Sequence, residues 1–126
     1  MNILIDTHIL LWWLKNSSKL KKNQRALIKN QKNCIFISPV SIWEIVIKRS
    51  VKKLNADCNE ILKNIRLNNF IFIDINFKHV KNIENLPLIH KDPFDRMLIS
   101  QAIIEDYYLL TDDPNILKYE VKAARV

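Results

Sequence analysis

The sequence predicts an α/β domain whose parallel sheet, of about five strands, carries helices on both faces. Three observations lead to this class. Short apolar segments alternate along the chain with longer segments of helical character. The apolar segments do not alternate with polar residues, as expected for strands that are buried on both faces. A chain of 126 residues, 48% of them hydrophobic, is large enough to form one domain with its own core over residues 1–126.

The first predicted element is a strand over Asn2–Asp6, because its central residues are uninterruptedly apolar. Thr7 is a suitable N-cap for a helix over His8–Leu14. A polar helix is expected over Lys19–Gln31, and a second strand over Cys34–Ile37.

Ser38 and Pro39 combine a capping residue with a proline at the first helical position, which predicts a helix that ends near Arg49. The pattern of apolar residues then indicates a helix over Asp57–Asn68 and a third strand over Phe70–Ile73.

The last third of the chain begins with a short predicted helix at Lys78–Asn85. Asp92 and Pro93 again combine a cap with a proline and introduce a helix over Phe94–Glu105. Three further elements are predicted after it: a fourth strand at Tyr107–Leu110, a short helix opened by Asp113 and Pro114, and a fifth strand near Tyr119–Val121.

The composition favours some functions and excludes others. A net charge of +7 favours a polyanionic partner such as a nucleic acid. The chain contains no glycine, which excludes the glycine-dependent motifs of dinucleotide enzymes, P-loop NTPases and serine α/β-hydrolases. Tight turns must then use asparagine. Cys34 and Cys58 lack the spacing of a zinc site. No apolar run approaches the length of a membrane span, so we expect a cytoplasmic protein without membrane contact.

Four acidic residues are candidates for a common site. Asp6 follows the first strand and Asp113 the fourth, and the carboxyl ends of parallel strands meet at one edge of a sheet. Glu44 and Asp95 lie in the helices that begin at the two proline positions. Each acid also has a purely structural interpretation: Asp6 as a strand-end residue, Glu44 as half of a surface ion pair, and Asp95 and Asp113 as helix-start residues.

Taken together, four carboxylates around one edge would repel each other unless a cation neutralised them. Hard oxygen ligands favour Mg²⁺ or Mn²⁺. An acidic metal site and a polyanionic substrate suggest metal-assisted hydrolysis of phosphodiester bonds.

Four segments, in this order, carry a resemblance to a known family: Leu4-Ile5-Asp6-Thr7-His8 with Leu10-Leu11-Trp12, Ser38-Pro39-Val40-Ser41-Ile42-Trp43-Glu44 with Ile47-Lys48, His90-Lys91-Asp92-Pro93-Phe94-Asp95-Arg96-Met97-Leu98-Ile99, and Leu110-Thr111-Asp112-Asp113. With them the sequence resembles the PIN domains, and more closely the VapC-type toxin ribonucleases of toxin–antitoxin pairs. The D-P-F-D-R-x-L-I and S-x-W-E blocks are the most specific. The segments span nearly the whole chain.

The resemblance implies a metal-dependent endoribonuclease with an RNA substrate, a cognate antitoxin and a homodimeric state. The family's acids fall on Asp6, Glu44 and Asp95, and its Thr-x-Asp pattern selects Asp113, with Asp112 as the alternative. Mg²⁺ or Mn²⁺ would be held directly by Asp6 and Asp95. Where the family often has a glycine before its fourth strand, this chain has Glu105-Asp106-Tyr107.

Supporting roles are expected for three further residues. Thr7 or Thr111 would hydrogen-bond a ligand carboxylate or a phosphate, and Arg96 would form a salt bridge with Asp95 or Asp92.

Other polar and aromatic residues have simpler interpretations. His8 and His90 are not needed by a metal-bound water mechanism, and His79 is expected to be a packing or surface residue. The tryptophans are expected in the core or at a dimer face; they are Trp12, Trp13 and Trp43.

Two classes other than a nuclease remain open from the residues alone. One is a PIN-like scaffold that binds RNA or protein without cutting. The other is a receiver-type phospho-switch, which would use Asp74 after the third strand but lacks the acidic pair after the first.

Overall fold

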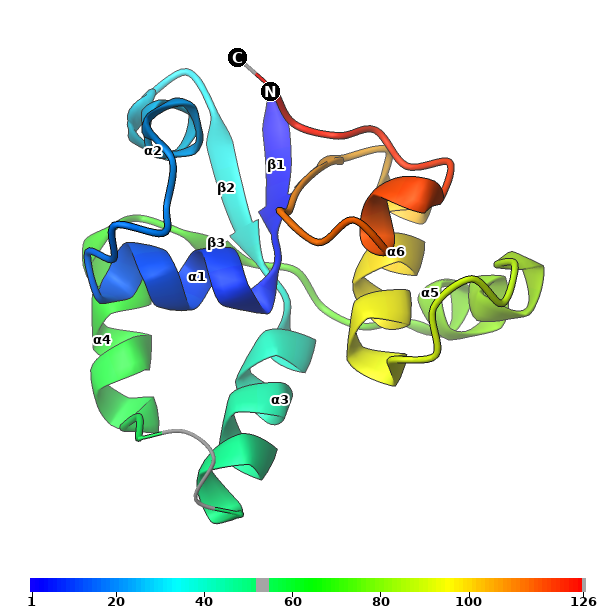
Figure 1. Cartoon of the computed structure of the whole chain (residues 1–126), viewed down its shortest axis with the longest axis horizontal. Coiled ribbons are helices and arrows are strands. Elements are labelled where there is room, and N and C mark those ends of the chain that lie inside the picture. The colour runs from blue at the N-terminus through cyan, green and yellow to red at the C-terminus, as the bar shows by residue number, and fades with distance from the viewer. Residues whose placement is uncertain (52–54, 126) are drawn as a thin grey trace.

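The computed structural model describes residues 1–51 and 55–125, which form a parallel sheet between two groups of helices (Figure 1). The strands of these residues are β1 (Asn2–Ile5), β2 (Cys34–Ile37), β3 (Ile71–Phe72) and β4 (Tyr108–Leu110). They pair in the order β3-β2-β1-β4, and each pairing is parallel. The predicted α/β class with a parallel sheet is confirmed.

Helices connect the strands. The described α-helices are α1 (Thr7–Leu14), α2 (Lys22–Lys29), α3 (Pro39–Ser50), α4 (Cys58–Leu67), α5 (Phe77–Asn82) and α6 (Pro93–Glu105), with 3-10 turns at Ile83–Asn85 and Ile116–Lys118. Helices α1, α2 and α4 lie on one side of the sheet in Figure 1, and α5 and α6 lie on the other.

The core is divided by the sheet, and the two central strands contribute to both halves. Ile3 and Ile5 of β1 pack with α1, α2 and α4, whereas Leu4 between them packs with α6. All three side chains are fully buried. Their burial on both faces explains why the strand shows no polar alternation and fixes its carboxyl end, where Asp6 follows, at the centre of the sheet edge.

The C-terminal segment runs beside β4 without forming a regular fifth strand. Ala123 makes an isolated parallel bridge with Leu109 in the described chain, supported by hydrogen bonds of the Leu109 backbone to Lys122 and Ala124. The segment predicted as a strand, Tyr119–Val121, lies just before this bridge. The Tyr119 N–H donates to the Ile116 carbonyl of the preceding 3-10 turn, and the Tyr119 carbonyl accepts the Val121 N–H, so these backbone groups are not paired with β4.

Two predicted helix starts were wrong. The N-cap of α1 is Asp6 and not Thr7, because an Asp6 oxygen accepts the Ile9 N–H at 2.8 Å. Asp113 does not cap a helix directly: its carboxylate accepts the Asn115 N–H at 2.8 Å, and the 3-10 turn begins only at Ile116. In both places a side chain does accept a backbone N–H as a cap would, but the N-cap position lies one or two residues away from the predicted one.

Candidate active site

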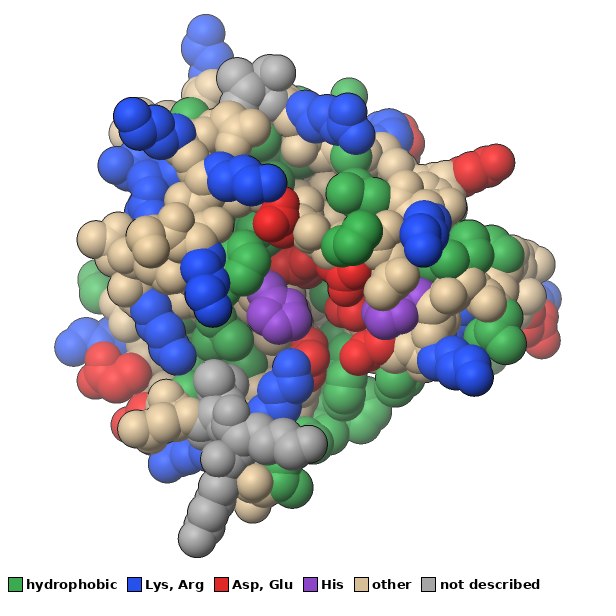
Figure 2. All heavy atoms as spheres, viewed as in Figure 1, with side chains coloured by type: hydrophobic (Ala, Val, Ile, Leu, Met, Phe, Trp, Pro, Cys, Tyr) green, Lys and Arg blue, Asp and Glu red, His purple; other side chains and the backbone are tan. Residues whose placement is uncertain are grey.

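The acidic residues singled out in the sequence converge at the carboxyl edge of the sheet. Figure 2 shows acidic side chains and histidines gathered at the centre of one face, with lysines and arginines on the surface around them. Asp6 follows β1 and Asp113 follows β4, which is the neighbour of β1. Helices α3 and α6 contribute Glu44 and Asp95.

Asp6 is the most constrained of these carboxylates, with 2% of its surface exposed. One of its oxygens accepts the Ile9 N–H, and the other accepts a short hydrogen bond from the Thr111 hydroxyl. Burial raises the pKa of Asp6 to about 6, although both hydrogen bonds favour the ionised form. The charge of Asp95 adds to the rise, which indicates that the two carboxylates share one electrostatic environment.

Glu44 lies on the inner face of α3 and is only 4% exposed. Its Oε2 pairs with Lys48 Nζ at 2.8 Å, which is the i, i+4 pair expected from the sequence. The carboxylate is nevertheless buried, so the surface ion pair does not describe it. Its Oε1 is buried and has no hydrogen-bond partner among the described residues. A buried carboxylate oxygen without a partner is costly unless a water or an ion satisfies it.

Asp95 is placed by the first turn of α6. Its backbone N–H is accepted by the N-cap Asp92, and its Oδ2 lies 2.8 Å from His90 Nε2. Burial raises the pKa of Asp95, the negative charges of Asp92 and Glu44 raise it further, and His90 opposes the rise. Asp95 therefore shares the field of Glu44 as well as that of Asp6.

Asp113 approaches the same place from the loop after β4. Its backbone N–H donates to the Thr111 hydroxyl, so Thr111 links Asp113 to Asp6. Asp113 Oδ2 lies 4.0 Å from His90 Nε2. In the described part of the chain, His90, Asp95 and Asp113 each offer a ligand atom within 4.8 Å of the others.

Asp112 is directed elsewhere. Its carboxylate is bound by Lys21 Nζ at 2.9 Å and by Gln24 Nε2 at 3.3 Å, both from the region of α2. Asp113, which lies beside His90, therefore fits the acidic site better than the alternative Asp112 does.

The expected supporting residues differ in their outcome. Thr111 binds the Asp6 carboxylate as described above, but the Thr7 hydroxyl donates to Ser41 Oγ at 3.0 Å and does not reach a carboxylate. The salt bridge predicted for Arg96 with Asp95 or Asp92 is absent from the described residues. Its guanidinium donates instead to the carbonyls of Ile83, Pro87 and His90 and to the Tyr119 hydroxyl.

His90 is the residue that sequence reasoning left out of the site. A general base is not required when a metal-bound water is the nucleophile, so the sequence does not predict a role in the site for His90. The signal available was its place at the start of the resembling segment His90–Ile99, two residues before the D-P-F-D-R-x-L-I block and five residues before Asp95. His8 is exposed and His79 is fully buried, where its Nε2 lies 2.8 Å from Glu105.

The donor set fits a hard divalent cation. Carboxylate oxygens come from four different elements of the fold, the pKa values of Asp6 and Asp95 are raised, and Glu44 Oε1 lacks a partner. The burial of ionised Asp6 and Asp95 and the unpartnered Glu44 oxygen cost stability in the free protein, and Mg²⁺ or Mn²⁺ would relieve these costs. The residues present therefore fit the metal that the acidic pattern predicts.

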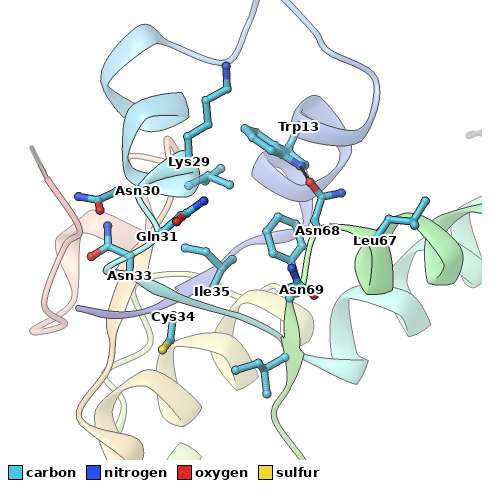
Figure 3. A pocket seen from close by; sticks show the side chains of 13 residues that line it. Trp13, Lys29, Asn30, Gln31, Asn33, Cys34, Ile35, Leu67, Asn68 and Asn69 are labelled. Carbon is cyan, nitrogen blue, oxygen red and sulfur yellow. Dashed lines mark hydrogen bonds between the residues drawn. The ribbon is translucent and has the colours of Figure 1, made fainter.

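The pocket beside the acids is much smaller than a second pocket that lies away from them. A pocket of about 230 Å³ beside the acids is lined by Asp6, His8, Trp12, Asp112 and Asp113. A larger pocket of about 730 Å³ lies where α1, α2 and α4 meet the beginnings of β2 and β3 (Figure 3). Side-chain amides, Trp13, Lys29 and Cys34 line this larger pocket, which contains no carboxylate or imidazole. The smaller pocket thus borders Asp6 and Asp113, whereas Glu44, Asp95 and His90 are not part of its lining.

Comparisons with known proteins agree with the geometry. The PIN domain family model matches residues 3–122. Among solved structures, this chain matches one chain of a crystal structure of VapBC2 from Rickettsia felis bound to a DNA fragment from their promoter. The TM-score is 0.70. The match covers 98% of this chain and 96% of that chain at 22% sequence identity.

A search of curated proteins found no match. None of the described helices is long and apolar enough to cross a membrane. Because the PIN domain model matches residues 3–122, nearly the whole chain, the receiver-type interpretation is excluded. The chain belongs to the PIN domain family.

Proposed function

We propose that this PIN domain is a metal-dependent endoribonuclease and the toxin of a type II toxin–antitoxin module. The observation that supports it best is the convergence of Asp6, Glu44, Asp95 and Asp113, from separate parts of the chain, at one edge of the sheet. The likeness of the fold to a chain of a VapBC2 structure supports the toxin assignment.

Asp6 and Asp95 would hold Mg²⁺ or Mn²⁺ directly, and Glu44 and Asp113 would ligate through water or complete a second site. When bound, such an ion would lower the pKa of a water that serves as nucleophile, and a second ion would stabilise the leaving oxygen. The chain itself fixes the site: Thr111 and the Ile9 N–H orient the Asp6 carboxylate. Lys48 holds Glu44 without occupying its second oxygen.

The basic surface would bind the RNA backbone. The net charge is +7 although the acids are concentrated in the centre, and lysines and arginines surround them on the face in Figure 2. Such a surface neutralises phosphates, so RNA affinity should fall steeply as salt increases.

Partners follow from the same proposal. A cognate antitoxin would inhibit the enzyme by covering the acidic region, and the protein would act in the cytoplasm as a homodimer. Apolar side chains available for such contacts are exposed on α3, where 57% of the Trp43 surface is accessible. Light scattering of the purified chain measures the homodimer directly.

The test is cleavage of a mixed RNA pool by purified protein with Mg²⁺ or Mn²⁺, and with EDTA. Asp95→Asn keeps the shape of the side chain but removes a ligand charge, and should reduce cleavage at least about 100-fold. Asp113→Asn should reduce it as well. Asp106→Asn is the matched control: Asp106 is an exposed acid paired with Lys122 at the end of α6, and the cleavage rate of this variant should stay close to wild type.

Discrete cuts that disappear with EDTA and in Asp95→Asn would support the proposal. An identical pattern from wild type and Asp95→Asn would indicate a contaminating nuclease and remove the acidic-site model. If no RNA is cut while RNA still binds, a non-catalytic scaffold becomes the better description.

A further inference from the structure

We propose that His90 is a nitrogen ligand of the metal site and makes that site prefer a transition-metal ion such as Mn²⁺ over Mg²⁺. This inference rests on the proposed function, because it assumes that a divalent ion occupies the acidic edge. It adds a residue that the four-carboxylate pattern does not contain.

The geometry places the His90 ring between two of the candidate ligands. Its Nε2 lies 2.8 Å from Asp95 Oδ2 and 4.0 Å from Asp113 Oδ2. These three side chains form the group of potential ligand atoms within 4.8 Å of one another in residues 1–51 and 55–125. All three are partly exposed, so an ion from solvent can reach them.

The loop that carries His90 is fixed on both sides of its backbone. The His90 N–H donates to the Tyr119 hydroxyl at 2.9 Å, and its carbonyl accepts from the same hydroxyl at 3.3 Å and from Arg96 at 3.4 Å. Arg96 also binds Tyr119 and the Pro87 carbonyl. The imidazole is therefore held at the acids by a scaffold that does not use the acids themselves.

The chemical type of the ligand atoms determines which ion binds more tightly to this group of residues. Mg²⁺ prefers oxygen ligands and keeps several of its waters, whereas an imidazole nitrogen suits first-row transition ions. Two carboxylates with one imidazole form a mixed set. Such a set strengthens binding of Mn²⁺ more than binding of Mg²⁺.

A different role is consistent with the same 2.8 Å contact. His90 could donate its Nε2–H to Asp95 and only orient that carboxylate, as a neighbour of a ligand often does. An orienting hydrogen bond affects both ions similarly, whereas direct ligation affects Mn²⁺ selectively. The two roles are therefore separable by a measurement on the bound ion.

Pulsed electron paramagnetic resonance of Mn²⁺ bound to the purified full chain provides that measurement. Direct ligation gives a ¹⁴N modulation from the imidazole, which should be present in wild type and absent in His90→Gln. His8→Gln is the matched control. His8 is also a histidine near the acids, in the smaller pocket, but it does not belong to the group of His90, Asp95 and Asp113, so its loss should leave the modulation intact.

Metal affinities, measured by titration of Mn²⁺ with Mg²⁺ as competitor, complete the test. His90→Gln should weaken Mn²⁺ binding at least about ten-fold and Mg²⁺ binding less. Equal losses for both ions, or bound Mn²⁺ without ¹⁴N modulation in wild type, would overturn the role of His90 while leaving the carboxylate site standing. Absence of Mn²⁺ binding, or binding that Asp95→Asn does not weaken, would overturn the metal site itself.

Discussion

Replacing Asp6 by asparagine should stabilise the metal-free protein at neutral pH. The folded state raises the pKa of Asp6 from 3.8 to about 6, chiefly because the carboxylate is buried. A shift of about 2 pKa units corresponds to about 3 kcal/mol of unfavourable free energy when Asp6 is ionised. Asparagine keeps an oxygen to cap α1, accepting the Ile9 N–H as Asp6 does.

The pH dependence of this effect has a definite sign. Between pH 3.8 and about 6 the native state binds more protons at Asp6 than the unfolded state does, so the stability of the wild type falls as pH rises. Below pH 3.8 both states are protonated at Asp6 and its penalty disappears. Above pH 6 the penalty is complete.

The assay is urea denaturation of wild type and Asp6→Asn in EDTA from pH 3.5 to 7.5. The advantage of Asp6→Asn should grow by about 3 kcal/mol across this range, equivalent to roughly 10 °C in Tm for a chain of this size. Comparing the two proteins isolates Asp6, because the other carboxylates titrate in both. A difference that does not change with pH would refute the reasoning, and so would a variant that is less stable at pH 7.5.

Three further outcomes are expected. Mg²⁺ should raise the Tm of the wild type in a concentration-dependent manner but not that of Asp95→Asn, which differential scanning fluorimetry can show. Arg96→Ala should destabilise the fold by about 2–3 kcal/mol in urea, because it removes the hydrogen bonds of Arg96 to the Pro87 and His90 carbonyls and to the Tyr119 hydroxyl, and should increase hydrogen exchange in the loop before α6. Asp106→Gly should raise stability by about 1 kcal/mol in thermal denaturation, because Asp106 adopts the left-handed conformation with φ of 59°.

The missing glycines were a reliable guide to the turns. The sequence predicts that asparagine must provide left-handed residues, and Asn16 and Asn69 do so after α1 and α4, with φ of 50° and 58°. Asp106 takes the third such position in the described chain, at the end of α6. This is the place where the resembling family often has glycine. Local chemistry decides these positions, so the sequence contains the information.

The regular elements were predictable for the same reason, and their ends less so. Strands β1, β2 and β4 and the proline-opened helices α3 and α6 lie where the sequence places them, to within a residue at their ends. The third strand is shorter than predicted, and its residues Ile71 and Phe72 are exposed. The segment Tyr119–Val121 has strand-like residues, but Tyr119 is fixed by the His90 loop and Arg96. Contacts between residues 29 and 23 positions apart override the local preference there. No spacing rule contains such contacts.

His90 was missed for a related reason. Its ring reaches Asp95 because Tyr119, 29 residues further along the chain, holds its backbone. The sequence shows His90 and Asp95 five residues apart, which places the two side chains on no common face of a helix. The contact depends on the loop conformation and becomes visible only in three dimensions.

The structural and functional interpretations of the acids turn out not to exclude each other. Asp6 caps α1 with one oxygen, and its other oxygen, bound by Thr111, faces the loop that carries Asp113. Asp113 binds the Asn115 N–H with Oδ1, while its Oδ2 approaches His90. Glu44 pairs with Lys48 through Oε2 and leaves Oε1 unpartnered. In Asp113 and Glu44 one carboxylate oxygen fixes the local backbone or a neighbour, while the other accepts no hydrogen bond from the described residues. In Asp6 both oxygens accept a hydrogen bond, so an ion there would use a remaining lone pair. A capping or ion-pairing role inferred from sequence is therefore no argument against a ligand role, and here it explains how the ligands are held in place.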